Sequence, residues 1–138
     1  MKRRVLTRRR GFFQDEQGAG LVEFAMVSGV FTIILLGFVE AGFAAWSKNS
    51  VFSDAREGAR FAMVRGSTAT AHVATNDSVA AYVRSKTSLD SIRVTTTWHP
   101  DNAAGSTVWV HVEHDVPRRG PFIRAHMDSS TSKMVITY

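Results

Sequence analysis

Apolar residues dominate the stretch from Gln17 to Trp46, and their pattern predicts the longest element of the chain. Residues 24–39 are sixteen consecutive positions without a charge, and sixteen helical residues cover roughly 24 Å at about 1.5 Å each. Continuing through Glu40 to Trp46 supplies the remaining length that a bilayer-spanning helix needs. We therefore predict one transmembrane helix here, with Trp46 and Lys48 suited to its far interface.

The helical pattern continues beyond this span as far as Arg65. Glu57 and Arg60 stand one turn apart as a supporting ion pair, and Gly66 is placed to cap the helix C-terminus. One helix of about 70 Å is therefore expected from about Gly18 to Arg65, apolar first and amphipathic afterwards. Apolar positions recur at intervals of three and four, namely Val51, Phe52, Ala55, Ala59, Ala62 and Met63.

Residues 67–138 predict a small antiparallel α+β head. After a polar linker, a short helix is expected to start at Asn76, Asp77 or Ser78 and to run to about Thr87. The period then changes to two, which is typical of strands. The first strand carries Ile92, Val94 and Thr96 on one face and stops before His99. The second carries Val108, Val110, Val112 and Val116, and the third is Met134–Tyr138.

Candidate chemistry in the head is sparse. His111, Glu113 and Asp115 share one face of the second strand, but positions i to i+4 span about 13 Å, too far to hold one metal ion without a bulge. The chain has no cysteine, which excludes disulfides and thiolate chemistry. No nucleophile motif or phosphate-binding glycine loop is present, so we expect no enzyme activity, cofactor or metal. Arg118 and Arg119 are expected to be solvated loop residues, with an interaction surface as the alternative.

Charge is concentrated at the N-terminus. The net charge is +5, of which residues 1–18 carry +4. Lysine and arginine ahead of an apolar helix hold that end in the cytoplasm, which places the head on the other side of the membrane. No aromatic residue is interleaved with the arginines of residues 1–10, so nucleic acid is not an expected partner.

Two glutamates interrupt the apolar stretch. A carboxylate is costly in hydrocarbon and implies a partner or an interfacial position, and Glu40 is expected at the outer interface. Glu23 lies five residues after Gly18. Small residues that allow close approach of another helix are Ser28, Gly29, Gly37 and Gly42.

The spacing around Gly18 is similar to the processing signal of type IV pilin-like proteins. A charged leader precedes the glycine, and cleavage after it would make Ala19 the new N-terminus, with Glu23 at the fifth position and Phe24 at the sixth. The new α-ammonium group of Ala19 is a partner for Glu23 of a neighbouring subunit. Such an ion pair would offset the cost of burying the carboxylate in a helix bundle.

The chain resembles the TadE-like minor pilins, or pseudopilins, of the tight-adherence (Flp-type) pilus system. The likeness is densest in residues 14–66, through QDEQGAGLVEFAMV, LLGFVEAG with Glu40 and Gly42, and SDAREGARFAMVRG. The A-R-E-G-A-R segment of the family is matched by Ala55, Arg56, Glu57, Gly58, Ala59 and Arg60. The chain departs from the family in having Phe43 and Ala44 after the second acidic position, and in lacking a cysteine pair in the head.

The resemblance implies a type IV pilin-like fold and four kinds of partner: a membrane prepilin peptidase that cuts after Gly18, other pilin subunits, an assembly platform and an assembly ATPase. It divides the chain into a leader (1–18), a transmembrane assembly helix (19–47), an amphipathic extension (48–66) and an extracytoplasmic head (67–138). The expected function is assembly of an adhesive or secretion pilus from the cytoplasmic membrane. A single-pass anchored binding module that is not processed, and a domain secreted by signal peptidase, are the alternatives.

Overall fold

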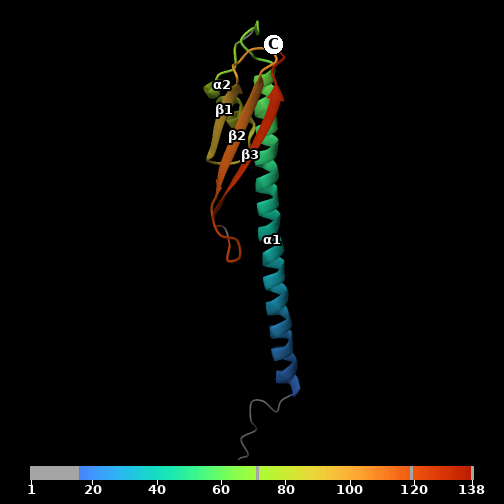
Figure 1. Cartoon of the computed structure of the whole chain (residues 1–138). Coiled ribbons are helices and arrows are strands. Elements are labelled where there is room, and N and C mark those ends of the chain that lie inside the picture. The colour runs from blue at the N-terminus through green and yellow to red at the C-terminus, as the bar shows by residue number, and fades with distance from the viewer. Residues whose placement is uncertain (1–15, 71, 119, 138) are drawn as a thin grey trace, which may run out of the picture. The chain divides into compact units, whose positions relative to one another are not determined.

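A computed structural model describes residues 16–70, 72–118 and 120–137. Five elements follow one another along the chain (Figure 1): α1 (Glu16–Met63), α2 (Asn76–Lys86), β1 (Ile92–His99), β2 (Thr107–Val116) and β3 (His126–Val135). The predicted α+β architecture, a long apolar helix followed by a short helix and an antiparallel sheet, is confirmed. Residues 1–15 of the predicted leader lie outside the described part, as do Ala71, Arg119 and Tyr138.

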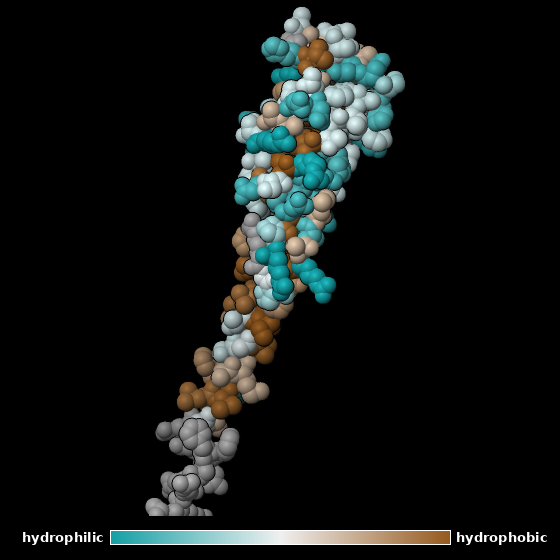
Figure 2. Space-filling model, turned by 90° about the vertical axis from the view of Figure 1, so that its left-hand side faces the viewer, coloured by the Kyte–Doolittle hydropathy of each residue, from teal (hydrophilic) through white to brown (hydrophobic). Residues whose placement is uncertain are grey.

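The chain divides into two compact units, Met1–Val39 and Glu40–Tyr138. In the first unit, α1 exposes its large apolar side chains, with Leu21 72% and Phe24 71% accessible. Figure 2 shows these side chains as brown atoms at the surface, whereas the surface of the head is mostly hydrophilic. By length and composition, α1 could cross a membrane. Thr32 satisfies its hydroxyl within the helix, donating a hydrogen bond of 2.8 Å to the carbonyl of Ser28.

The second unit is built on a three-stranded antiparallel sheet in the order β1-β2-β3. Val94 pairs with Val112 in the β1–β2 ladder, and Val112 pairs with Ser130 in the β2–β3 ladder. Because side chains alternate between the two faces of a strand, the valines of β2 all point to one face. Val108, Val110 and Val112 are fully buried there, as the period-two pattern predicted.

The core lies between this valine face, α2 and the second part of α1. Helix α2 contributes Val79, Ala80 and Val83. From α1 come Val51, Ala55, Ala59 and Ala62, all less than 2% exposed. Four of the six apolar positions predicted for the amphipathic face are therefore fully buried. Met63 is only partly buried against the core, and Phe52 was assigned wrongly, because its side chain is 48% exposed and lies under the guanidinium group of Arg56.

Other details differ from the sequence prediction. Helix α1 ends at Met63, three residues before the glycine that was expected to cap it. The N-cap of α2 is Thr75, whose hydroxyl accepts a hydrogen bond from the N–H of Ser78 in a capping box. β1 includes His99, one residue beyond the predicted end.

The third strand was placed too late in the sequence. β3 runs from His126 to Val135, so only Met134 and Val135 of the predicted strand belong to it. The missed residues include the run Asp128–Lys133, which is polar throughout. Because β3 pairs with β2 alone and its side chains are largely exposed, this strand did not need the apolar alternation that reveals a buried one.

Gly58 is the point of closest approach between α1 and the rest of the core. A Cβ added there would lie 2.8 Å from Cγ2 of Val83 and 3.0 Å from Cγ1 of Val110. Both valines are fully buried and have stiff branched side chains, so neither can move aside easily. A glycine at this position lets α2 and β2 reach the surface of α1 together.

We expect Gly58→Val to lower the free energy of unfolding of the head by about 1–3 kcal/mol, because it overpacks a closed core. Gly42→Val is the matched control, since a Cβ at Gly42 meets no atom within 4 Å, and it should change the stability by less than about 0.5 kcal/mol. Thermal unfolding of the detergent-solubilised chain, followed by near-ultraviolet circular dichroism, measures the difference. Equal stability of the two variants would contradict the packing described here.

Candidate functional site

The residues of the predicted processing signal lie in the first two turns of α1. Gly18 and Ala19 are already helical, and Glu23 and Phe24 are exposed one turn further on. Within the described ranges, the carboxylate of Glu23 forms no hydrogen bond or ion pair. Its carboxylate is therefore free to meet a group from another molecule.

The apolar part of α1 leaves room for another helix. A Cβ added to Gly20, Gly29, Gly37 or Gly42 would meet no atom within 4 Å. Glycines allow helix backbones to approach closely in a membrane. These positions are therefore open to lipid or to a neighbouring helix.

Glu40 has a role that the sequence did not reveal. Its carboxylate accepts hydrogen bonds from two successive backbone N–H groups in the loop between β2 and β3, from Phe122 at 3.1 Å and from Ile123 at 2.8 Å. We call residues 117–125 the β2–β3 loop. Glu40 was predicted to lie at the membrane interface without a specific partner, whereas here it fastens this loop to α1.

Gly120 makes this attachment possible. A Cβ built on Gly120 would overlap the carboxylate of Glu40, so a side chain here would displace this carboxylate from its present position. Arg118 supports the turn from within, because its Nε donates a hydrogen bond of 3.1 Å to the carbonyl of Gly120. The hydrogen bonds join Glu40 to residues 82 and 83 positions further along the sequence, which is why no local motif predicted them.

The family segment at residues 55–60 divides into a buried and an exposed side. Ala55, Gly58 and Ala59 are buried in the core, while Arg56 and Arg60 are exposed on the opposite side of the helix. This segment therefore presents a surface of small residues against which the head packs.

Glu57 completes the attachment of α2. It accepts a hydrogen bond of 2.8 Å from the hydroxyl of Tyr82, and this hydrogen bond is the main reason why the pKa of Tyr82 is raised. In the described part of the chain Glu57 forms no ion pair with Arg60, so the predicted helix pair is wrong. One turn earlier, Asp54 accepts a short hydrogen bond from the hydroxyl of Thr87 at the C-terminus of α2.

A buried polar contact fixes β3 to α1. The hydroxyl of Ser47 donates a hydrogen bond of 2.8 Å to Asp128, and both side chains are buried. Nε2 of His126 lies 3.4 Å from the other carboxylate oxygen of Asp128. His114, the cross-strand partner of Asp128, is also buried. It lies on the valine face, between Val112 and Val116, at a position that was not predicted to be buried.

The outer face of the sheet carries cross-strand polar pairs. Arg93 donates a hydrogen bond of 2.9 Å to Glu113, and this contact is the main reason why the pKa of Glu113 is lowered. Nε2 of His111 lies 3.4 Å from the same carboxylate, while Nδ1 of His111 lies 2.7 Å from the hydroxyl of Thr131. Asp115 is exposed. Within the described residues, no group of three such side chains is placed to hold a metal ion.

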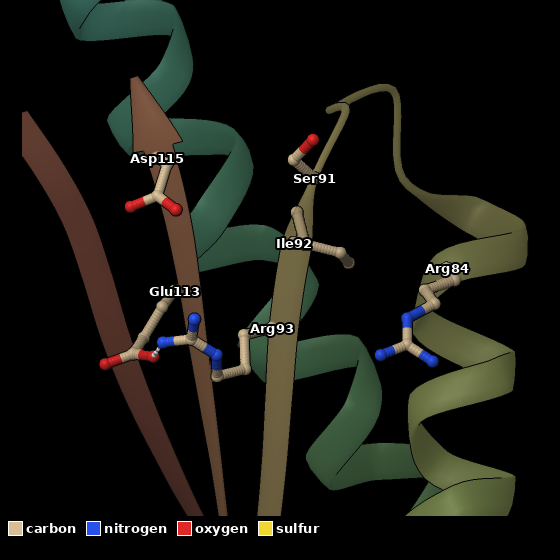
Figure 3. Close-up of a pocket in the computed structure, with 6 residues that line it drawn as sticks. All are labelled: Arg84, Ser91, Ile92, Arg93, Glu113 and Asp115. Carbon is tan, nitrogen blue, oxygen red and sulfur yellow. Dashed lines mark hydrogen bonds and ion pairs between the residues drawn. The ribbon is translucent and has the colours of Figure 1, made fainter. Parts of the chain in front are cut away.

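One end of this face is hollowed into a pocket of about 330 Å³. Figure 3 shows Arg84 of α2 on one side of the pocket and Asp115 of β2 on the other, with the Arg93–Glu113 pair between them. Ser91 and Ile92 complete the lining. Ser91 has a φ of 57°, a left-handed conformation that is uncommon for residues other than glycine.

The described residues form a long helix followed by a small α+β head, and the first part of the helix is apolar and exposed. These features define the class of protein. Residues 18–60 match the family model described as TadE-like protein, and the resemblance predicted from the motifs is thereby confirmed. The match relates the chain to proteins of the tight-adherence pilus system. It covers Gly18, both glutamates and the A-R-E-G-A-R segment. Comparison with curated proteins and with solved structures gives no match.

We expect Glu40→Ala to release the β2–β3 loop from α1. Hydrogen bonds to a charged acceptor contribute about 1.5–3 kcal/mol each, so the backbone amides of Phe122 and Ile123 should lose protection from hydrogen exchange by about tenfold or more. Nuclear magnetic resonance of the detergent-solubilised chain measures this exchange. Glu23→Ala removes a carboxylate from the same helix and should leave both amides unchanged. Unaltered protection in Glu40→Ala would contradict the contact.

Proposed function

We propose that this chain is a minor pilin, or pseudopilin, of a tight-adherence pilus, made as a membrane-anchored precursor and cleaved after Gly18. The observation that carries the proposal is the match of residues 18–60 to the TadE-like family, which begins at that glycine. Its partners would be a prepilin peptidase, other pilin subunits and an assembly platform in the cytoplasmic membrane. Its role would be structural rather than enzymatic.

The exposed apolar surface of α1 supports an assembly role. Before assembly the bilayer covers this surface, with the basic leader holding the N-terminus in the cytoplasm. Within a filament or at its base, the same surface would be covered by α1 of other subunits. Because the apolar unit ends at Val39 and the head begins at Glu40, extraction from the membrane would not require the head to unfold.

Glu23 would guide this packing. Cleavage produces an α-ammonium group at Ala19, and Glu23 has no partner in its own chain within the described residues. A carboxylate that enters an apolar bundle needs a charge partner. The amine of a neighbouring subunit supplies that partner and would fix the axial register of the two helices.

An unprocessed membrane-anchored binding module is the second candidate. The pocket between Arg84 and Asp115 favours it, because the pocket presents charges of both signs on the head. The mature N-terminus separates the candidates. Ala19 supports the pilin, Met1 supports the anchored module, and a start near Trp46 supports a secreted domain.

Gly18→Ala should leave the leader attached, because it adds a side chain at the position that the peptidase must accept. The intact mass of the protein purified from membranes should then correspond to a start at Met1, whereas the unaltered chain should start at Ala19. Gly20→Ala is the matched control, since Gly20 is also an exposed glycine of α1 but lies beyond the cleaved bond. Normal cleavage of Gly18→Ala would overturn the proposed site.

Glu23→Ala should be cleaved normally and yet fail to assemble, because its helix cannot form the intersubunit ion pair. Counting pili by electron microscopy, together with the intact mass, separates the two steps. Glu23→Asp keeps the charge on a shorter side chain and should retain part of the assembly. A Glu23→Ala strain with a normal number of pili would refute the role assigned to this carboxylate.

A further inference from the structure

The β2–β3 loop has an unusual surface for a solvated turn. Its sequence, PRRGPFIRA, contains three arginines and no acidic residue. Arg118 and Arg124 are exposed, and the ring of Phe122 between them is 51% accessible. Cationic side chains beside an exposed aromatic ring are the combination that binds the surface of an anionic bilayer.

The attachment to Glu40 determines where this loop lies along α1. Glu40 directly follows the uncharged run of residues 24–39. Residues 24–39 cover roughly 24 Å as a helix, which is most of the thickness of a bilayer core. The loop is therefore held where this uncharged run ends.

The loop itself cannot lie deeper than this. Irregular backbone exposed to hydrocarbon leaves its N–H and C=O groups without partners, and arginine is costly at membrane depth. Because the loop is bound to Glu40, the outer edge of the hydrocarbon core lies at about Val39. This position is seven residues earlier than the end at Trp46 expected from hydropathy, and it leaves Trp46 in the interfacial layer, where tryptophan is enriched.

We propose that the β2–β3 loop binds the phosphate groups of anionic phospholipids on the outer surface of the membrane that α1 spans. Arg118 and Arg124 contact the phosphates, and Phe122 enters the upper part of the acyl chains. The hydrogen bonds to Glu40 come from backbone N–H groups, so this attachment uses no arginine side chain. The loop thereby sets the depth and tilt of the head.

A groove lies about one turn further along α1. It has a volume of about 490 Å³, and its lining includes Ala44 and Lys48 of α1 and His126 and Asp128 of β3. Ala44 is four residues beyond Glu40, or about 6 Å along the helix, which is within the headgroup layer. Lys48 adds a cationic group where a lipid phosphate would lie.

The proposal rests on the membrane span of α1 and is independent of pilin processing. The chain contains no cysteine, so single cysteines introduced by Phe122→Cys, Val73→Cys or Ile34→Cys can each carry one nitroxide label. The full-length chain is placed in nanodiscs of phosphatidylglycerol mixed with phosphatidylcholine, or of phosphatidylcholine alone. Collision of the label with oxygen, which enters lipid, and with a water-soluble nickel chelate is measured by electron paramagnetic resonance.

The label at position 122 should favour oxygen over the nickel chelate in the anionic discs. The label at 73, another exposed position of the head, should favour the nickel chelate. The combined change Arg118→Gln and Arg124→Gln should lower the ratio of immersed to free loop by about tenfold or more. Arg56→Gln with Arg60→Gln removes the same charge from the exposed side of α1 and should not change this ratio.

Three results would overturn the proposal, and the label at position 34 shows whether the chain is inserted in each case. If position 34 is in lipid while position 122 favours the nickel chelate, the loop is solvated. If position 122 is shielded from both reagents, the loop is covered by protein instead of lipid. If its immersion does not depend on phosphatidylglycerol or on the arginines, phosphate recognition is wrong.

Discussion

The contact at Gly58 is the constraint on which the head depends. Val83 of α2 and Val110 of β2 both reach the surface of α1 at this point, and Ala55, Ala59 and Ala62 extend the same flat surface along the helix. A core assembled on small residues gains its stability from close approach rather than from large side chains. Hydrogen bonds from Tyr82 and Thr87 to α1 then orient α2 on this surface, so a chain without disulfides can hold a small head on one helix.

This arrangement gives α1 different surroundings along its length. The part before Glu40 has no cover from its own chain in the described residues, whereas the part after Ser47 supplies one wall of the core. A helix that is apolar on all sides suits lipid, and one that is amphipathic suits a protein core. The match to TadE-like proteins covers residues of both parts of this helix.

Periodic patterns predicted most of the fold, because burial on one face leaves a repeating signal in the sequence. The helix, the valine face of β2 and the small residues of α1 were all found in this way. Contacts that join distant positions leave no such signal. The bonds from the β2–β3 loop to Glu40 and the Ser47–Asp128 pair both depend on the folded topology. β3 was misplaced because a polar edge strand is specified by pairing with its neighbour rather than by its own hydrophobicity.

The hydrogen bonds at Glu40 are formed with backbone N–H groups, which every residue except proline possesses. Substitution of Phe122 or Ile123 by another residue would therefore leave the attachment intact, whereas Gly120 and Glu40 cannot change without losing it. The exposed side chains of this turn can therefore be exchanged without moving the turn along the helix.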